Sequence, residues 1–381
     1  MIRAYLDNNA TTQPFAEVLE ARRIYDEELY FNASSTAGDL LGASRPFGDA
    51  QRAMRELLGS TDTADRIILT SGATEANAWA FHQVPPGEGK VVISATEHSS
   101  ILAACERRSD SHAVSVDQNG LIDLNALAAH LGDETRLVSV QLANNETGVV
   151  QPLVAIGECI EQRAPRAILH CDATQAVGRI PIDLNGDLAR VDLLSFSAHK
   201  FHGPKGLGGL FIRGGMPIAP LIQGTQQDGA RGGTLNSPGA AGLAVAARMA
   251  RDNLDLMPFV AALRNRLEDR LQALWPSARF HGAGADRLPN TCCVSLPGCD
   301  AEEFVEQLAM RGVCVAAGSA CTAGASAPSH VLVAMGVPRD EIFGALRFSL
   351  SVKTTADEID AAVASLEEIA GQFAIGEPAD G

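Results

Sequence analysis

Lysine is scarce in this sequence. Only four of its 30 basic residues are lysines, and these are Lys90, Lys200, Lys205 and Lys353. Two of the four lie five residues apart in the stretch SFSAHKFHGPKGLGG at 195–209. A lysine amine can lose its proton and form a Schiff base with a carbonyl compound, which a guanidinium does not do. The pair therefore makes this stretch a candidate for such chemistry.

Positive charge and long apolar runs are also missing. The formal net charge is −16, which argues against a general binder of nucleic acid or of membrane surfaces. No apolar run approaches the roughly 18 residues of a membrane-spanning helix. The N-terminal stretch MIRAYLDNNATTQ has no signal-peptide core. We therefore expect a cytoplasmic protein that does not cross a membrane and does not bind nucleic acid directly.

The cysteines lack the spacing of a metal site. No C-x-x-C pair occurs, so we expect no zinc, iron–sulfur or other metal site in the chain. Without a secretion signal, disulfides are not expected either. We interpret seven of the eight cysteines as buried, inert thiols: 105, 159, 171, 292, 293, 299 and 314. Cys321 differs, because it lies in a run of small residues, AAGSACTAGASAPSH.

The hydrophobic pattern predicts an α/β fold. Between residues 66 and 212, short apolar runs alternate with amphipathic helical stretches, which is typical of a mostly parallel sheet covered on both faces. Farther along the chain, a strand at LPNTCCVSLP, a strand at VCVAA and a helix around 329–336 indicate a smaller α+β unit. We predict a large α/β domain at 14–258 and a small α+β domain at 1–13 and 259–381.

Polar side chains follow the apolar runs. Five predicted strands end in TSGATE, ATEHSS, LANNETG, CDATQ and SFSAHK. The carboxyl ends of parallel strands lie along one edge of an open sheet, where ligands bind. Five such clusters in succession predict an active site at that edge.

Individual clusters indicate parts of a cofactor site. SGATEANAWAF places a glycine turn and Thr74 at a helix N-terminus, which suits a phosphate. Asp172 could face a protonated ring nitrogen, and Lys200 follows a strand that ends at the same edge. Together these features outline pyridoxal phosphate chemistry. Taken singly, such residues have simpler interpretations. The SGAT stretch could be an ordinary helix cap, Asp172 a turn aspartate, His98 a structural histidine and Lys205 a solvated lysine.

The ordered motifs resemble those of a known family. They are YLDNNATT, TSGATEAN, EHSSIL, ANNETG, DATQAVGRIPID, SFSAHKFHGPKG, GGTLN, LPNT, GSACTAG, PSHVL and LRFSLS. Across nearly the whole chain they are similar to the cysteine desulfurases, the NifS/IscS-like group of fold-type I pyridoxal-phosphate enzymes. The resemblance implies the fold-type I architecture, pyridoxal 5′-phosphate as cofactor, and conversion of L-cysteine to L-alanine.

The resemblance also implies roles for particular residues. Lys200 would hold the cofactor as an internal aldimine, His98 would lie against its ring, Asp172 would pair with the ring nitrogen and Gln175 would contact O3′. Phosphate contacts would come from Ala73, Thr74, Ser197 and His199. Thr234 would reach the phosphate of a neighbouring subunit, which implies a homodimer. Asn145 and Arg347 would bind the amino-acid carboxylate, although a surface ion pair is the simpler interpretation of Arg347.

Cys321 distinguishes the reaction. The family uses the cysteine at this position to take sulfur from the substrate as a persulfide, and GSACTAG resembles its long-loop branch. The sulfur would then pass to an acceptor protein. Iron–sulfur scaffolds and cluster assembly, nitrogenase maturation, tRNA thiolation and DNA sulfur modification all remain open as destinations.

Two other functions stay open from the sequence. One is a selenocysteine lyase or a related lyase or aminotransferase with the same cofactor. The other is a non-catalytic scaffold of a sulfur-transfer complex, which the intact Lys200, His98, Asp172 and Cys321 argue against. The segments 31–42 and 223–235 depart from common family patterns. We expect those departures to affect the entrance, the dimer edge or partner docking more than the reaction.

Overall fold

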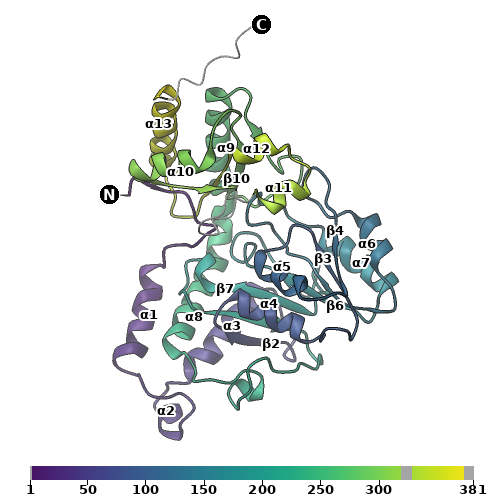
Figure 1. The fold of residues 1–381 in the computed structure, drawn as a ribbon. Coiled ribbons are helices and arrows are strands. Elements are labelled where there is room, and N and C mark those ends of the chain that lie inside the picture. The colour runs from purple at the N-terminus through teal and green to yellow at the C-terminus, as the bar shows by residue number, and fades with distance from the viewer. Residues whose placement is uncertain (1, 319–327, 373–381) are drawn as a thin grey trace.

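The computed structural model describes residues 2–318 and 328–372. Figure 1 shows a large sheet with its helices in the lower part of the molecule and a second group of helices and strands above it. The N-terminus lies in the upper group, so the chain starts there before it enters the lower part.

The large sheet has seven strands among the described residues. Their order across the sheet is β2-β8-β7-β6-β5-β3-β4. The strands are β2 (Arg66–Thr70), β3 (Lys90–Ser94), β4 (Ser111–Val114), β5 (Thr135–Ser139), β6 (Ile168–Asp172), β7 (Leu193–Ser197) and β8 (Gly208–Ile212). Neighbours pair in parallel from β7 to β4, whereas β8 pairs antiparallel with both β7 and β2. The predicted α/β fold with a mostly parallel sheet is confirmed.

Apolar residues on both faces of these strands account for the layers. In β3, Val92 belongs to the main core cluster, while Val91 and Ile93 belong to a cluster on the opposite side. Burial on both faces is typical of parallel strands and explains their continuous apolar runs. The helices of this part are α1 (Ala16–Glu27), α2 (Thr36–Leu40), α3 (Arg45–Leu57), α4 (Ala73–His82), α5 (Ser99–Glu106), α6 (Leu124–His130), α7 (Leu153–Arg163) and α8 (Ser237–Asp252). Residues of α4 and α5 pack on one face of the sheet, and residues of α3, α6, α7 and α8 on the other.

A second, antiparallel sheet forms the core of the upper part. Its strand order is β12-β13-β10-β9, and β1 pairs in parallel with β11 beside it. These strands are β1 (Ala4–Tyr5), β9 (Arg279–Phe280), β10 (Thr291–Ser295), β11 (Val313–Cys314), β12 (Ala316–Ala317) and β13 (Ala345–Ser349). The helices are α9 (Met257–Leu274), α10 (Ala301–Met310), α11 (His330–Ala334), α12 (Arg339–Phe343) and α13 (Ala356–Gln372). Short 3₁₀ turns are η1 (Ala198–Lys200), η2 (Gln227–Gly229) and η3 (Asn253–Leu256).

One predicted strand has a different form in the structure. The run VCVAA is divided into β11, which pairs with β1, and β12, which pairs with β13. The two halves therefore join different sheets, and an apolar run alone does not show which partner each residue pairs with. The predicted helix around 329–336 is confirmed in a shorter form, as α11.

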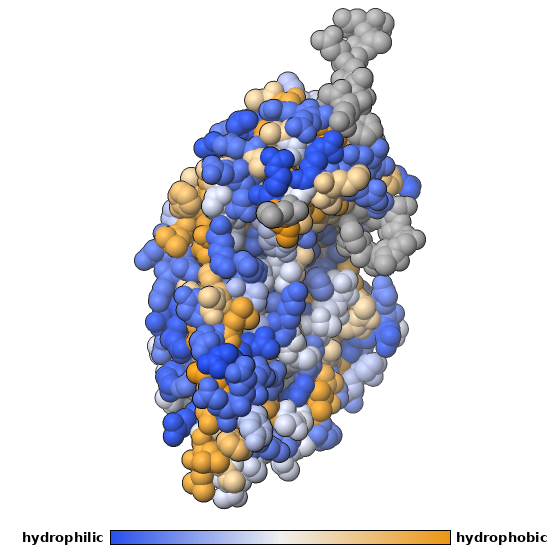
Figure 2. Space-filling model, turned by 90° about the vertical axis from the view of Figure 1, so that its left-hand side faces the viewer, coloured by the Kyte–Doolittle hydropathy of each residue, from blue (hydrophilic) through white to orange (hydrophobic). Residues whose placement is uncertain are grey.

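The surface has two features that concern function. No helix in the described part of the chain is long and apolar enough to cross a membrane. Exposed apolar side chains occur at Tyr30, Leu40 and Leu41, in and beside α2. Figure 2 shows hydrophobic surface at the lower end of the molecule, where Figure 1 places α2.

Candidate active site

A cavity of about 480 Å³ opens at the carboxyl-terminal edge of the large sheet. This volume lies within the range of small-molecule and cofactor sites. Its lining comes from the strand ends and from the segment before α1: Thr11, Ser71, Gly72, Ala73, Thr74, Asn77, His98, Ser100, Gln141, Ala143, Asn145, Asp172, Thr174, Gln175, Ser197, His199, Lys200, Lys205 and Gly206. The active-site edge predicted from the five polar clusters is thus the place where the described residues enclose this cavity.

The N-terminus of α4 forms one end of the cavity. Ala73 and Thr74 occupy the first turn of α4, and Ser197 ends the nearby strand β7. Gly208 pairs with Ser197 and lets the turn at Gly72 lie close to the strands. A Cβ at position 208 would lie 2.4 Å from the Phe196 carbonyl oxygen and 2.7 Å from the Cα of Gly72. The first-turn amides and the positive end of the helix dipole suit a phosphate group.

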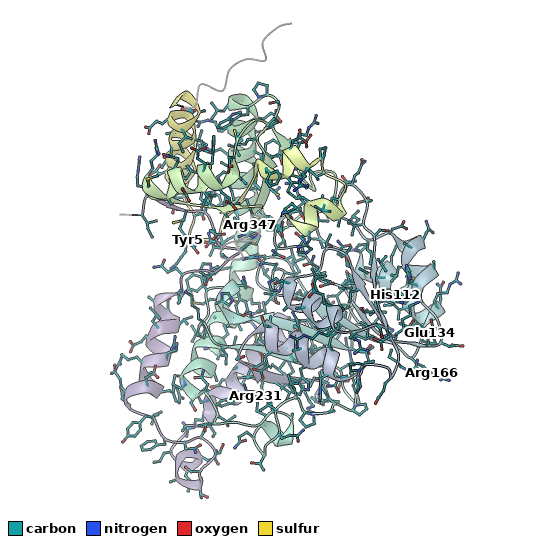
Figure 3. The ribbon with its side chains drawn as sticks, viewed as in Figure 1. Tyr5, His112, Glu134, Arg166, Arg231 and Arg347 are labelled. Atoms are coloured by element: carbon teal, nitrogen blue, oxygen red, sulfur yellow. The ribbon has the colours of Figure 1, made fainter. Side chains whose placement is uncertain are left out.

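An ion pair supports the same helix N-terminus. Glu75 accepts a hydrogen bond from the Ser71 backbone N–H at 2.8 Å. It also accepts hydrogen bonds from two guanidinium nitrogens of Arg231 at 2.9 and 3.1 Å. Burial works to raise the pKa of Glu75, but the bonds from Arg231 and Ser71 lower it overall. Arg231, labelled in Figure 3, therefore neutralises an acid that would otherwise oppose an anion at this end of the cavity.

Lys200 is held by main-chain oxygens. It lies in the η1 turn just after β7, and its Nζ donates to the carbonyl of Asn9 at 2.6 Å and to that of Ala10 at 2.9 Å. Burial, with Arg179 and Arg347 adding, lowers the pKa of Lys200 to about 8, although Asp172 and Asp7 oppose the shift. A lowered pKa leaves more of the amine unprotonated near neutrality, as a carbonyl-binding lysine requires.

A buried arginine lies behind Lys200. Arg179 is 6% exposed and donates to the carbonyls of Asn8 at 3.1 Å and Lys200 at 3.3 Å. It also donates to the backbone and side-chain oxygens of Gln175, whose Nε2 donates in turn to Asn9. Burial, with Arg347 adding, lowers the pKa of Arg179 to about 9. Arg179 thus joins the lysine turn, Gln175 and the N-terminal segment.

His98 and Asp172 belong to one hydrogen-bonded network of side chains in the cavity lining. Asn77 donates from Nδ2 to Asp172 Oδ2 at 2.8 Å and to Ser100 Oγ at 3.0 Å. Ser100 contacts His98 Nδ1 through its hydroxyl at 2.9 Å. The second oxygen of Asp172 accepts from the Thr174 backbone N–H at 3.0 Å. The carboxylate is therefore held in place and faces the cavity.

The two residues expected to bind substrate occupy different positions. Asn145 lines the cavity, whereas Arg347 on β13 does not. Arg347 is mostly buried, pairs with Asp7 at 2.7 Å, and donates to the Asn145 carbonyl at 3.3 Å. Its Nε has no hydrogen-bond partner among the described residues. Arg347 is therefore not a surface ion pair. Figure 3 shows it with Tyr5 between the upper helices and the large sheet.

The remaining predicted residues lie around the cavity or outside the described chain. His199 lines the cavity and contacts Thr11 Oγ1 through Nδ1 at 3.0 Å. Thr234 lies in an adjoining hollow of about 170 Å³ that shares Ser71 and Gly206 with the main cavity. Lys205 is exposed in a turn, as its simpler interpretation required, yet it also lines the cavity. Cys321 lies outside the described residues.

The predicted burial of the other seven cysteines is confirmed for four of them and is wrong for three. Cys105, Cys171, Cys292 and Cys293 are buried, while the thiols at 159, 299 and 314 are half-buried. Burial raises the pKa of Cys293 to about 12 and of Cys299 to about 11. A raised pKa leaves little thiolate, so these two thiols are poor nucleophiles. The described residues contain no group of histidine, cysteine and acidic side chains arranged to hold a metal ion.

The cavity fits pyridoxal phosphate chemically. It combines an amine, a carboxylate, an imidazole and a helix N-terminus, which are the groups that bind this cofactor's aldehyde, ring nitrogen, ring face and phosphate. Two buried polar atoms of its lining, Asn77 Oδ1 and Thr174 Oγ1, have no hydrogen-bond partner among the described residues. Buried polar atoms are normally paired, so these two are suited to a polar ligand.

Sequence reasoning missed some cavity residues, including Thr11, Asn77 and Ser100. Asn77 lies four positions after Ala73 in α4, so the helical repeat places both on one face. That spacing was a usable signal. Thr11 reaches the cavity through the path of the N-terminal segment, for which the local sequence gives no signal.

Comparisons with known proteins identify the family of the chain. The aminotransferase class-V family model matches residues 4–362. The cysteine desulfurase of Cereibacter sphaeroides is 43% identical over 382 residues, covering 98% of this chain and 97% of the relative. That of Rhodobacter capsulatus is 40% identical over 383 residues, covering 97% of each. The solved structure of a NifS-like protein superposes with a TM-score of 0.89 at 34% identity, covering 97% of this chain and 100% of the other. The chain therefore belongs to the aminotransferase class-V family, and within it is a cysteine desulfurase that depends on pyridoxal phosphate.

Proposed function

We propose that Cys321 is the residue that receives sulfur from L-cysteine and carries it as a persulfide to an acceptor protein. The observation that carries this proposal is the position of the chain just after the segment 319–327. His330 there contacts the backbone oxygen of Glu97 at 2.8 Å, next to His98 in the cavity lining. Ser329 donates to the buried Glu146. The described residues that follow the segment with Cys321 are thus held next to the cavity.

The proposed sulfur transfer is balanced without another reactant. The Cys321 thiolate attacks Sγ of L-cysteine, an S–S bond forms, and the Cβ–Sγ bond of the substrate breaks. A proton added at Cβ completes L-alanine. A thiolate is needed because it is the nucleophilic form of cysteine. The electron-withdrawing ring of pyridoxal phosphate supplies the activation at the substrate Cα.

The residues of the cavity would hold that cofactor and move protons. We assign Lys200 to the covalent bond with the cofactor and to proton transfer at its Nζ, consistent with its lowered pKa. His98 would lie against the ring, Asp172 would pair with the ring nitrogen, and Gln175 would contact O3′. The phosphate contacts are assigned to Ala73, Thr74, Ser197 and His199, which all line the same cavity.

The substrate carboxylate is assigned to Asn145 and Arg347. Arg347 would exchange Asp7, which accepts one hydrogen bond from its guanidinium, for the carboxylate of the substrate. The bond from Arg347 to the Asn145 carbonyl already places the two residues side by side.

We also propose a homodimer in which Thr234 contacts the phosphate held by the other subunit. Thr234 faces a hollow beside its own cavity, and exposed apolar residues around α2 offer a surface for association. Light scattering that gave an active monomer would remove this role. The division into domains 14–258 and 1–13 with 259–381 is consistent with the two large core clusters. We infer a cytoplasmic location from the sequence.

The decisive experiment is Cys321→Ser. The variant should keep the absorbance of the lysine-bound cofactor at ~420 nm and respond spectrally to L-cysteine, because neither event needs this thiol. It should form neither alanine nor a protein persulfide, since a serine hydroxyl is far too weak a nucleophile. Alanine release and persulfide labelling are the measurements.

Cys299→Ser is the matched control. Cys299 is half-buried and its thiol has a raised pKa, so its replacement should leave desulfurase activity largely intact. Release of alanine and sulfide by Cys321→Ser at near the parental rate would refute the persulfide role. The chemistry would then be that of a lyase without a cysteine nucleophile.

A further inference from the structure

His98 caps the N-terminus of α5 with its own ring. The backbone N–H of Ser100 lies 3.2 Å from His98 Nδ1, and the Ser100 hydroxyl lies 2.9 Å from the same nitrogen. A backbone amide can only donate a hydrogen bond, so Nδ1 must be the acceptor. A neutral ring that accepts at Nδ1 carries its proton on Nε2.

The direction of the remaining bonds follows from this one. Because Nδ1 accepts, the Ser100 hydroxyl donates to it. The oxygen of that hydroxyl is then free to accept from Asn77 Nδ2 at 3.0 Å. The second hydrogen of Asn77 Nδ2 points to Asp172 Oδ2 at 2.8 Å. Both hydrogens of the amide are committed, and the carboxylate fixes which end of the amide faces it.

Building on the proposed role of His98 in the cavity, we propose that Asn77 and Ser100 are positioning residues. They fix His98 as the neutral ring with its proton on Nε2 and connect that ring to Asp172. His98 and Asp172 are the two groups assigned to the same cofactor ring, so a single chain of side chains sets the position of both.

This hydrogen-bonded network also limits which nitrogen of His98 can carry a proton. A proton added at Nδ1 would face the N–H of Ser100, so two donors would oppose each other. The surroundings of the ring also disfavour a second proton: desolvation lowers the pKa of His98 and outweighs the opposing charge of Asp172, and Lys200 and His330 lower the pKa further. Nε2 has no hydrogen-bond partner among the described residues, and the ring lines the cavity. His98 therefore offers the cavity a hydrogen-bond donor at Nε2, rather than a base at Nδ1.

Nitrogen NMR of the histidine rings in the apoenzyme tests this assignment without the cofactor. His98→Ala identifies the His98 signals. The parental protein should show an unprotonated Nδ1 and a protonated Nε2 that persist as the pH falls toward the range where free histidine titrates. A signal pattern with the proton on Nδ1, or rapid exchange between both nitrogens, would overturn the proposal.

Ser100→Ala removes the hydroxyl and keeps the backbone donor. One hydrogen bond to the neutral ring is lost, so the ratio of protonated to neutral His98 at a given pH should rise about two- to ten-fold. Ser100→Thr restores a hydroxyl and should restore the parental ratio. Asn77→Ala should act in the same direction but less, because it acts through Ser100.

Ser99→Ala is the matched control. Ser99 is the exposed neighbour of Ser100, begins the same helix and takes no part in the chain to Asp172. It should leave the His98 signals unchanged. An unchanged His98 titration in a folded Ser100→Ala protein would refute the positioning role.

Activity measurements on the enzyme with bound cofactor distinguish the positioning role of Ser100 from the proposed role of His98 in the reaction. The pH profile of alanine formation should shift in Ser100→Ala and return in Ser100→Thr. If His98→Ala forms alanine at the parental rate, the proposed role of His98 is wrong, and the NMR result alone decides the tautomer.

Discussion

The ionisable groups in and next to the cavity form two clusters that are held by different means, and we call them the Lys200 side and the His98 side. On one side, Lys200 and Arg179 are cations whose hydrogen bonds go mainly to carbonyl oxygens of the backbone. On the other side, His98 and Asp172 are joined through the side chains of Asn77 and Ser100. Neither cation of the Lys200 side forms an ion pair with a described carboxylate, whereas the His98 side connects a ring to a carboxylate.

This difference has a physical consequence for each side. Cations that are buried together without a contacting acid lose stability in their charged forms, and the pKa values of Lys200 and Arg179 are lowered to about 8 and about 9. Reactivity of an amine gains from such a shift. A side-chain network whose donors and acceptors are fixed by their partners instead favours one tautomer and one orientation. One side is thus arranged for reactivity and the other for position.

The largest effect should come from removing the reactive amine. Lys200→Ala should abolish cofactor absorbance at ~420 nm and all alanine formation, because no other amine is held at that point. Lys205→Ala is the matched control. Lys205 lines the same cavity but is exposed in a turn, so this variant should keep the cofactor absorbance. Absorbance spectra of both purified variants decide the matter. The reverse pattern would place the reactive side of the cavity at Lys205.

Arg347 differs from Lys200 and Arg179, because it forms an ion pair with a carboxylate, that of Asp7, at 2.7 Å. If the substrate carboxylate replaces Asp7 on Arg347, the Arg347→Lys variant keeps the positive charge but loses the planar guanidinium that can donate two parallel hydrogen bonds. L-cysteine binding should then weaken by about 1–3 kcal/mol. Spectral titration with L-cysteine measures this loss.

Asp7→Asn provides the contrast to that variant. It frees Arg347 without altering its guanidinium, so L-cysteine should bind at least as tightly as before. Equal affinity in Arg347→Lys and the parental enzyme would show that Arg347 holds Asp7 for structure alone.

Local sequence patterns predict only part of this site. Thr74, His98, Asp172 and Ser197 each lie at the end of a strand or the start of a helix, so local patterns identify them and the parallel sheet gathers them at one edge. Thr234, Gln175 and Arg347 came from family resemblance rather than from local pattern. The resemblance also placed Cys321, whose surroundings lie outside the described residues.

The role of Arg179 could not be predicted from local sequence. Its contact with the carbonyl of Asn8 joins residues 171 positions apart, and the bond from Lys200 to Asn9 spans 191. Such contacts depend on where the N-terminal segment crosses the sheet edge. An arginine in a polar stretch after a strand would ordinarily be interpreted as solvated. Only the packed structure shows it to be buried behind the reactive lysine.

The smallest expected effect concerns the pH at which that lysine reacts. Lys200 is charged below its pKa and nucleophilic above it, so the apoenzyme should capture pyridoxal phosphate faster as pH rises and level off above about 8. Arg179→Met removes a cation that lowers this pKa, so the levelling should move to higher pH and capture at pH 7 should slow. Arg179→Lys, which restores a positive charge at the same place, should move the profile back. Stopped-flow absorbance across pH 6 to 10, with circular dichroism to verify folding, gives the profiles. A folded Arg179→Met protein with an unmoved profile would mean that the arginine only holds Gln175 and the N-terminal segment in place, and that burial and Arg347 are sufficient to lower the pKa of Lys200.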